Sequence, residues 1–175
     1  MNLVLVARCE DARDRLKVAM GSKYGAKIIC LPVDLSQIGC LQPLIEVCSD
    51  LEIGLVVNNA GTGHPGILSS CKIEKVMDVI RLDCLTQLEI THHFLPVMQG
   101  RGRGGIILVS SLMGFQGVPY MANSSATKGD LLNLGKALYH ECKASGVDVL
   151  VLAARATETL GKYLHEVDYS KLPIS

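Results

Sequence analysis

Short apolar runs alternate with longer helix-prone stretches along the chain. The runs are rich in Val, Ile and Leu and short enough to be buried strands; they cover residues 3–7, 27–33, 54–57, 105–109 and 147–152. The helix-prone stretches cover residues 10–23, 36–51, 72–95 and 120–144, with Ser36 as the expected cap of the second and an end at or shortly after Pro96 for the third. Strands that each lead into a helix form parallel sheets covered on both faces. The pattern therefore predicts a doubly wound α/β fold.

The pattern also indicates one folding unit. The chain has 175 residues, enough for one domain with a real core. It contains no internal repeat, low-complexity segment or linker, so residues 1–175 are expected to form a single domain. The tail from Thr157 is weakly patterned. Ligands of such sheets bind beyond the carboxyl ends of the strands, where segments such as 58–63 and 110–113 carry the Gly, Ser and Asn residues that a cofactor cleft needs.

Composition narrows the classes of function. Seventeen acidic residues balance seventeen basic ones, which argues against a nucleic-acid footprint. No apolar run approaches the ~20 residues of a membrane span. The apolar run at the N-terminus is too short for a signal peptide, so a cytoplasmic location is expected. The seven cysteines are odd in number and show no C-x-x-C spacing, so neither a disulfide framework nor a metal site is predicted.

One glycine pattern matches a phosphate-binding loop but is not expected to act as one. Gly61, Gly63 and Gly66 fit G-x-G-x-x-G directly after a predicted strand. Pro65 removes a backbone N–H from a loop whose function would be to donate N–H groups to phosphate. The next predicted strand begins only near residue 105, too late for a compact β-α-β unit.

An ordered set of short motifs resembles the short-chain dehydrogenase/reductase family. The most specific is Asn58-Asn59-Ala60-Gly61 after an apolar strand, which is similar to the "NNAG" motif of that family. Six further segments resemble family elements in the family's order: LVLVAR at 3–8, VDL at 33–35, FLPVM at 94–98, GIILVSS at 105–111, SATKG at 125–129 and VLAARATET at 151–159. The resemblance extends from residue 3 to about residue 160, and it implies a Rossmann-like fold.

The resemblance implies a reaction and its residues. Family members transfer hydride reversibly between a nicotinamide cofactor and a carbonyl or alcohol. By this resemblance Ser111 would hold the substrate oxygen. Lys128 would bind the nicotinamide ribose and lower the pKa of a neighbouring tyrosine.

The resemblance also implies a set of cofactor contacts. Arg8 lies where the family often selects NADP over NAD, because a guanidinium can pair bidentately with a 2′-phosphate. Asp34 would meet the adenine. The cofactor cleft would be lined by Asn58, Ala60 and Gly61, and contacts from Thr157 and Thr159 would complete it.

Two substitutions depart from the family pattern. Ser124 occupies the position of the catalytic tyrosine, four residues before Lys128. A phenol titrates near 10 and a neighbouring ammonium lowers that value, whereas a serine hydroxyl does not ionise in this range. Losing a general acid costs about 10²–10⁴ in rate. Asp83 stands where the family has an asparagine, and an ionised aspartate only accepts hydrogen bonds.

Segments of the family fold are also missing from the sequence. Met1 begins at what resembles the second strand, so the first strand-helix unit with its glycine-rich turn is absent, and Ala154-Arg155 replace the usual Pro-Gly. The chain also stops before the final strand and the substrate loop. We therefore interpret it as a truncated, Rossmann-like family member. If the first strand is absent, the strands that would flank it have unpaired edges or must pair with each other.

Two functions are compatible with these features. The first is an NADP-dependent oxidoreductase with impaired catalysis, acting on a small or lipid-like carbonyl. The second is a non-catalytic pseudoenzyme that acts through dimerisation or partner binding, through helices 72–95 and 120–144. The apolar stripe of the second helix could equally be core; it consists of Leu131, Leu134, Leu138 and Cys142. A serine hydrolase is not indicated, because no G-x-S-x-G motif is present.

Overall fold

A computed structural model describes residues 2–155 of the chain, without the side chains of residues 10–13. The chain forms two compact units, Met1–Ile53 and Gly54–Ser175. The α/β class with parallel sheets is confirmed, whereas the expectation of one domain stays a prediction. Within the described residues, no helix is long and apolar enough to cross a membrane.

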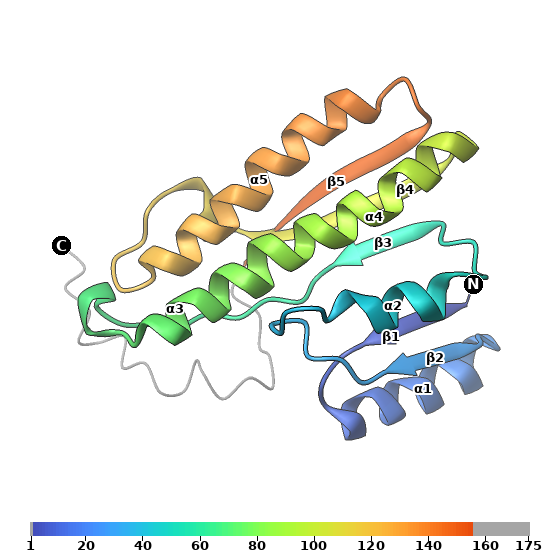
Figure 1. The fold of residues 1–175 in the computed structure, drawn as a ribbon, viewed down its shortest axis with the longest axis horizontal. Helices are drawn as coiled ribbons and strands as arrows, with labels where there is room; N and C mark the ends of the chain where they lie inside the picture. The colour runs from blue at the N-terminus through green and yellow to red at the C-terminus, as the bar shows by residue number, and fades with distance from the viewer. Residues whose placement is uncertain (1, 156–175) are drawn as a thin grey trace. The chain divides into compact units, whose positions relative to one another are not determined.

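The first unit contains a two-stranded parallel sheet. Strand β1 (Leu3–Val6) pairs with β2 (Ile28–Leu31), with Leu3 opposite Ile28. Helix α1 (Glu10–Tyr24) connects them, and α2 (Leu41–Cys48) follows β2 (Figure 1). The α1 helix ends at Gly25, whose left-handed conformation lets its N–H reach the carbonyl of Gly21.

The second helix of this unit does not begin at Ser36, as the sequence pattern predicted. A carboxylate oxygen of Asp34 accepts hydrogen bonds from the backbone N of Ser36 at 3.0 Å and from its hydroxyl at 2.7 Å. Asp34 therefore closes a local turn with Ser36. The helix starts only at Leu41, after Cys40, which makes no side-chain cap.

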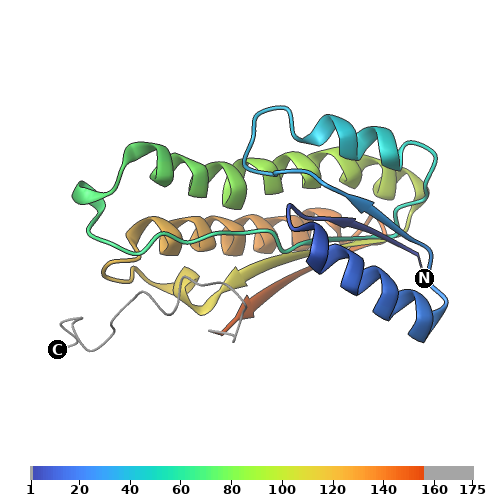
Figure 2. The same cartoon turned by 90° about the horizontal axis from the view of Figure 1, so that it is seen from below.

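The second unit is built on a three-stranded parallel sheet with the order β3-β4-β5. The strands are β3 (Leu55–Asn58), β4 (Gly104–Ser111) and β5 (Val147–Ala154). Helices α4 (Thr86–Arg101) and α5 (Ala122–Cys142) lie on the same side of β4 and β5 (Figures 1 and 2). Among the described residues β1 and β3 belong to separate sheets.

The covered side of this sheet forms the core. Ile106 and Leu108 of β4 and Leu131 of α5 are almost completely buried. Gly135 allows close approach, because a Cβ there would collide with the side chain of Val151. Alternation along the strands leaves the other side less covered, with half-exposed side chains at Leu55, Val57, Leu150 and Leu152.

A long helical segment between β3 and β4 is interrupted by a wider turn. Helix α3 (Ile73–Ile80) continues into a π-helical turn, η2 (Arg81–Leu85), and then into α4. The helix also runs through Pro96 to Arg101, a few residues past the proline near which the sequence pattern predicted its end. The helical periodicity of the sequence did not predict the π turn, which adds one residue to the local repeat and turns η2 side chains relative to α3.

The loops beside these helices complete the unit. They contain two 3₁₀ turns, η1 (Leu68–Ser70) and η3 (Leu112–Phe115). Helix α5 begins at Ala122, two residues later than predicted. Tyr120 precedes it with a left-handed backbone, φ 62°, and its carbonyl accepts the N–H of Gly66 at 2.8 Å.

Candidate functional site

A buried ion pair joins three segments of the second unit. Lys128 on α5 lies 3.1 Å from a carboxylate oxygen of Asp83 on η2. The other carboxylate oxygen accepts the backbone N–H of Thr62, in the loop after β3, at 2.9 Å. The hydroxyl of Thr127 lies 3.4 Å from the oxygen that pairs with Lys128. We call these four residues the Asp83 clasp.

Burial dominates the electrostatics of the clasp. The Asp83 side chain is completely inaccessible, while 15% of the Lys128 side chain remains exposed. Burial raises the pKa of Asp83, and the charge of Lys128 and the N–H of Thr62 oppose that rise. Burial also raises the pKa of the neighbouring Cys84 to about 12, with a further contribution from the charge of Asp130.

Two further backbone segments, β4 and the loop after β3, lie close to the lysine. Its ammonium lies 3.4 Å from the carbonyl oxygen of Val109, near the end of β4. Gly61 leaves room for it, because a Cβ at this position would lie 2.9 Å from the lysine nitrogen and 3.2 Å from Asp83. Gly61 therefore permits the loop to approach the ion pair.

Ser124 lies one helical turn before Lys128 and is 3% exposed. Its hydroxyl is buried and has no hydrogen-bond partner among the described residues. A Cβ added to Gly63 would lie 3.4 Å from this hydroxyl oxygen, so the loop after β3 passes close over it. The side chain thus contacts neither Lys128 nor Asp83 through a hydrogen bond.

The end of β4 is fastened to α5 beside the lysine. The hydroxyl of Ser110 donates to the backbone carbonyl of Lys128 at 2.7 Å. Ser111, the predicted substrate-binding residue, accepts the N–H of Met113 at 3.3 Å and caps η3. Gly114 in η3 packs directly on α5, since a Cβ there would lie 2.6 Å from the carbonyl oxygen of Lys128.

Asn58, the first asparagine of the "NNAG" motif, makes hydrogen bonds that hold β3 to α4. The Asn58 amide is buried and donates to the carbonyl of Gln87 at 3.2 Å and to the hydroxyl of Thr91 at 2.9 Å. Gln87 in turn donates to the carbonyl of Ala60. Asn58 and Ala60 are therefore joined to α4 by hydrogen bonds, while Gly61 lies against the clasp.

The two nucleotide-contact predictions of the first unit fall on neighbouring residues. Arg8 and Asp34 form an ion pair of 3.8 Å at the carboxyl ends of β1 and β2. Hydrogen bonds from Ser36, and more weakly the charge of Arg8, lower the pKa of Asp34. Arg8 is exposed and Asp34 is only half-buried, so the pair contributes at most about 1 kcal/mol to stability. The predicted contacts Thr157 and Thr159 lie outside the described residues.

Sequence reasoning missed three residues of this region. Thr62 contributes only its backbone N–H, which any residue but proline has, so no side-chain signal marks it. Thr127 lies inside the matched SATKG motif, but nothing in that motif gives it a contact. Gly114 has a turn-like sequence context, and only the packing on α5 explains why it is glycine.

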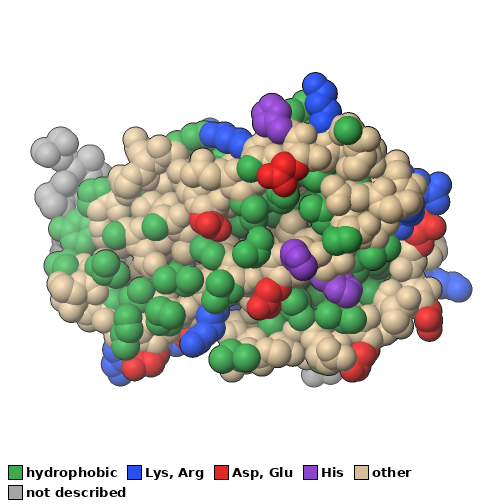
Figure 3. All heavy atoms as spheres, turned by 45° about the horizontal axis from the view of Figure 1, so that its top comes forward, with side chains coloured by type: hydrophobic (Ala, Val, Ile, Leu, Met, Phe, Trp, Pro, Cys, Tyr) green, Lys and Arg blue, Asp and Glu red, His purple; other side chains and the backbone are tan. Residues whose placement is uncertain are grey.

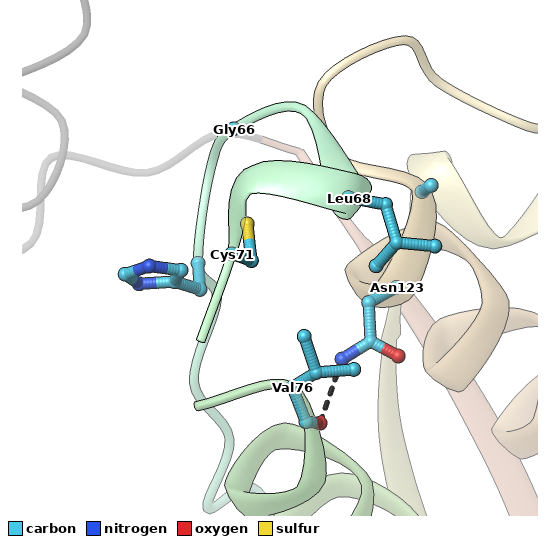
Figure 4. Close-up of a pocket in the computed structure, with 7 residues that line it drawn as sticks. Gly66, Leu68, Cys71, Val76 and Asn123 are labelled. Carbon is cyan, nitrogen blue, oxygen red and sulfur yellow. Dashed lines mark hydrogen bonds between the residues drawn. The ribbon is translucent and has the colours of Figure 1, made fainter. Parts of the chain in front are cut away.

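A shallow hollow lies apart from the clasp residues, between the loop after β3 and the first turns of α3 and α5. Figure 4 shows Leu68, Cys71, Val76 and Asn123 around it. The Asn123 amide donates to the carbonyl of Val76 at 2.9 Å, which links α5 to α3. None of the residues that line the hollow belongs to the Asp83 clasp.

Comparison with known proteins defines the class. A family model described as short chain dehydrogenase matches residues 1–163. The chain therefore belongs to the short-chain dehydrogenase/reductase family. The expected Rossmann-like fold is confirmed by a solved structure from work on 7beta-hydroxysteroid dehydrogenase stereoselectivity, with a TM-score of 0.88, 28% identity, and coverage of 100% of this chain and 65% of that one.

Individual relatives add detail. A 7beta-hydroxysteroid dehydrogenase of Clostridium sardiniense is 30% identical over 91% of this chain and 61% of its own length. A very-long-chain 3-oxoacyl-CoA reductase of Pyricularia oryzae is 28% identical over 92% and 50%. A short-chain dehydrogenase from Sphingobium yanoikuyae in complex with NADPH has a TM-score of 0.89 at 28% identity, with 98% and 68% covered. The chain thus spans about half to three fifths of these two curated relatives.

The residues around the lysine do not fit a nicotinamide cofactor in this arrangement. The ammonium that would hold the ribose is paired with Asp83 and directed toward Val109. The hydroxyl in the tyrosine position is buried beside Gly63. The ammonium of Lys128 is thus occupied by contacts within the chain, and the Ser124 hydroxyl is enclosed.

Proposed function

We propose that this chain is a short-chain dehydrogenase/reductase protein in which NADP-dependent hydride transfer is impaired. The observation that supports this most strongly is Ser124, a buried hydroxyl without a hydrogen-bond partner among the described residues, in the position of the family's acid. Reduction of a carbonyl requires a proton for the oxygen as hydride arrives at carbon. A serine hydroxyl does not supply that proton near neutral pH.

The two curated relatives suggest the ancestral substrate class. One is a hydroxysteroid dehydrogenase and another an oxoacyl-CoA reductase. Both names describe an oxygen function on a large lipid-like molecule. We infer that any substrate inherited by this chain is a lipid-like ketone or the corresponding alcohol, with NADPH as the hydride donor and a cytoplasmic location as expected from the sequence.

The proposal predicts no steady turnover. Purified protein is expected to oxidise NADPH, in the presence of steroid ketones or 3-oxoacyl thioesters, no faster than its Lys128→Ala variant. The measurement is NADPH absorbance over time with each carbonyl. Oxidation that depends on the carbonyl and disappears in Lys128→Ala would contradict the proposal.

A second candidate, a non-catalytic role through self-association, is favoured by one surface. The α3–α4 helical segment exposes Ile73, Met77, Leu85 and Leu88. Figure 3 shows that hydrophobic side chains gather in several groups among polar ones on the face it displays. The stripe predicted on α5 is mostly unavailable, because Leu131, Leu138 and Cys142 are buried in the core. For these three residues, the interpretation as core is the correct one.

Introducing one negative charge into this surface tests whether the chain self-associates through it. The wild-type chain is expected to be a dimer in solution, and Leu88→Glu is expected to convert it to a monomer, because a carboxylate buried in an interface is strongly unfavourable. Light scattering after size exclusion gives the mass. The control is Ile38→Glu, a 90% exposed position in the first unit. A monomeric wild type, or equal effects of both variants, would exclude this interface.

A further inference from the structure

We propose that Asp83 is a positioning residue that withholds Lys128 from an anionic nucleotide. The inference takes from the proposed function only the ligand class, a nicotinamide dinucleotide. It concerns binding, and its test measures no turnover. It can therefore fail while the proposal about proton donation stands, and the reverse also holds.

Asp83, which lies on η2, contacts both the loop after β3 and helix α5. Its two carboxylate oxygens receive the N–H of Thr62 at 2.9 Å and the ammonium of Lys128 at 3.1 Å, and Thr127 adds a longer contact. A charged, buried hydrogen bond is stronger than a neutral one. To reach a ligand, Lys128 would have to leave this arrangement and expose the carboxylate behind it.

The ammonium has little remaining capacity. A lysine offers three N–H donors, and two acceptors already lie beside it, the Asp83 carboxylate and the carbonyl of Val109. Gly61 brings the loop after β3 so close that a Cβ would lie 2.9 Å from the nitrogen. Loop, strand end and η2 thus enclose the charge that a ribose or phosphate would need.

Asp83 also neutralises the local field. An unpaired ammonium attracts a nucleotide that carries several negative charges, whereas a buried carboxylate at 3.1 Å cancels most of that attraction. An asparagine at 83 has nearly the same shape and can still accept the N–H of Thr62. It removes the charge that holds Lys128. The substitution therefore separates the ion pair with Lys128 from the hydrogen bond with Thr62.

The test is a cycle of four proteins titrated with NADPH: wild type, Asp83→Asn, Lys128→Met and the double variant. Asp83→Asn is expected to bind NADPH about 10-fold more tightly than wild type, the size of one charged hydrogen bond. Lys128→Met is expected to remove the about 10-fold gain in the Asp83→Asn background, because that gain requires the released ammonium of Lys128. NADPH fluorescence on binding provides the signal.

A matched control distinguishes the loss of the Asp83–Lys128 ion pair from the mere loss of one negative charge. Asp130→Asn removes the same charge from an exposed position of α5 that makes no ion pair with Lys128 among those described, and it is expected to leave NADPH affinity within about 2-fold of wild type. Equal gains from Asp83→Asn and Asp130→Asn would overturn the inference. So would an Asp83→Asn protein that binds NADPH no better than wild type, including one that shows no binding.

A second measurement needs no variant. Acylation of lysines in the wild-type protein, read by mass spectrometry, is expected to modify Lys128 more slowly than the exposed Lys136. Saturating NADPH is expected to leave the rate at Lys128 unchanged, because the nucleotide does not reach it. Protection of Lys128 by NADPH in the wild-type protein would overturn the inference even if Asp83→Asn fails to fold.

Discussion

Lys128→Met is expected to lower the free energy of unfolding by about 3–5 kcal/mol, because it leaves the buried Asp83 carboxylate without its counter-ion. The methionine fills a similar volume, so the loss reflects charge more than packing. Urea unfolding followed by circular dichroism measures it. We expect the slope of the transition to be preserved, which would assign the change to stability.

Two controls isolate the ion pair. Lys75→Met removes an exposed lysine from α3 and is expected to cost less than about 0.5 kcal/mol. Asp83→Asn combined with Lys128→Met is expected to be more stable than Lys128→Met alone, because no uncompensated charge remains. A Lys128→Met protein as stable as Lys75→Met would mean that the ion pair is not formed in solution.

The stability lost in Lys128→Met is expected to depend on pH. Burial raises the pKa of Asp83, and Lys128 opposes this, so removing Lys128 raises the pKa further. A carboxyl group whose pKa is raised in the folded state contributes stability below its unfolded pKa and loses it as pH rises through the folded value. The deficit of Lys128→Met is therefore expected to grow as pH rises above about 4, the pKa of an aspartate in the unfolded chain. A constant deficit would contradict the assignment.

Gly114→Ala is expected to cost about 1–3 kcal/mol, the range for inserting an atom into a packed interface. Its Cβ would lie 2.6 Å from the carbonyl oxygen of Lys128 and 2.7 Å from a methyl carbon of Leu132. One of these is backbone, so η3 must move away from α5. Thermal unfolding measures the loss.

The matched control for this glycine lies three residues later. A Cβ at Gly117 meets no atom within 4 Å, so Gly117→Ala is expected to be neutral or slightly stabilising by restricting the unfolded chain. If both alanine variants behave alike, η3 does not pack on α5 as described, and the placement of Ser111 relative to Lys128 loses its support.

The sequence was informative where local pattern and motif agree. Each of the five apolar runs overlaps one strand, and the family motifs correctly marked the chain as a short-chain dehydrogenase/reductase. The sequence pattern also correctly placed the motif around Lys128 on a helix. The spacing of Leu131, Leu138 and Cys142 predicted an apolar face of this helix, and these three residues are buried.

The arrangement around Asp83 could not be read from the same patterns. Helical periodicity assumes a regular repeat, whereas Asp83 lies in a π turn that changes the direction of its side chain. Its partner Thr62 takes part only through backbone. The function of Asn58 was likewise hidden, because its partners on α4 come from residues about thirty positions later in the sequence.

The start of the second helix shows a competing local interaction. Ser36 is a good N-cap by residue type, yet Asp34 binds both its N–H and its hydroxyl. A turn two residues long thereby replaces the expected first helical turn. Pro96 is the converse case, in which the rest of a long helix overrides the local preference of one residue.

The impairment of hydride transfer is tested most directly by following the hydride itself. The protein, at a concentration equal to that of the ligand, is incubated with NADPH deuterated at the transferable position and a steroid ketone, and the product is examined by mass spectrometry. We predict no deuterium in the alcohol above the level seen with Lys128→Ala. Deuterium transferred to carbon by the wild-type protein alone would contradict it.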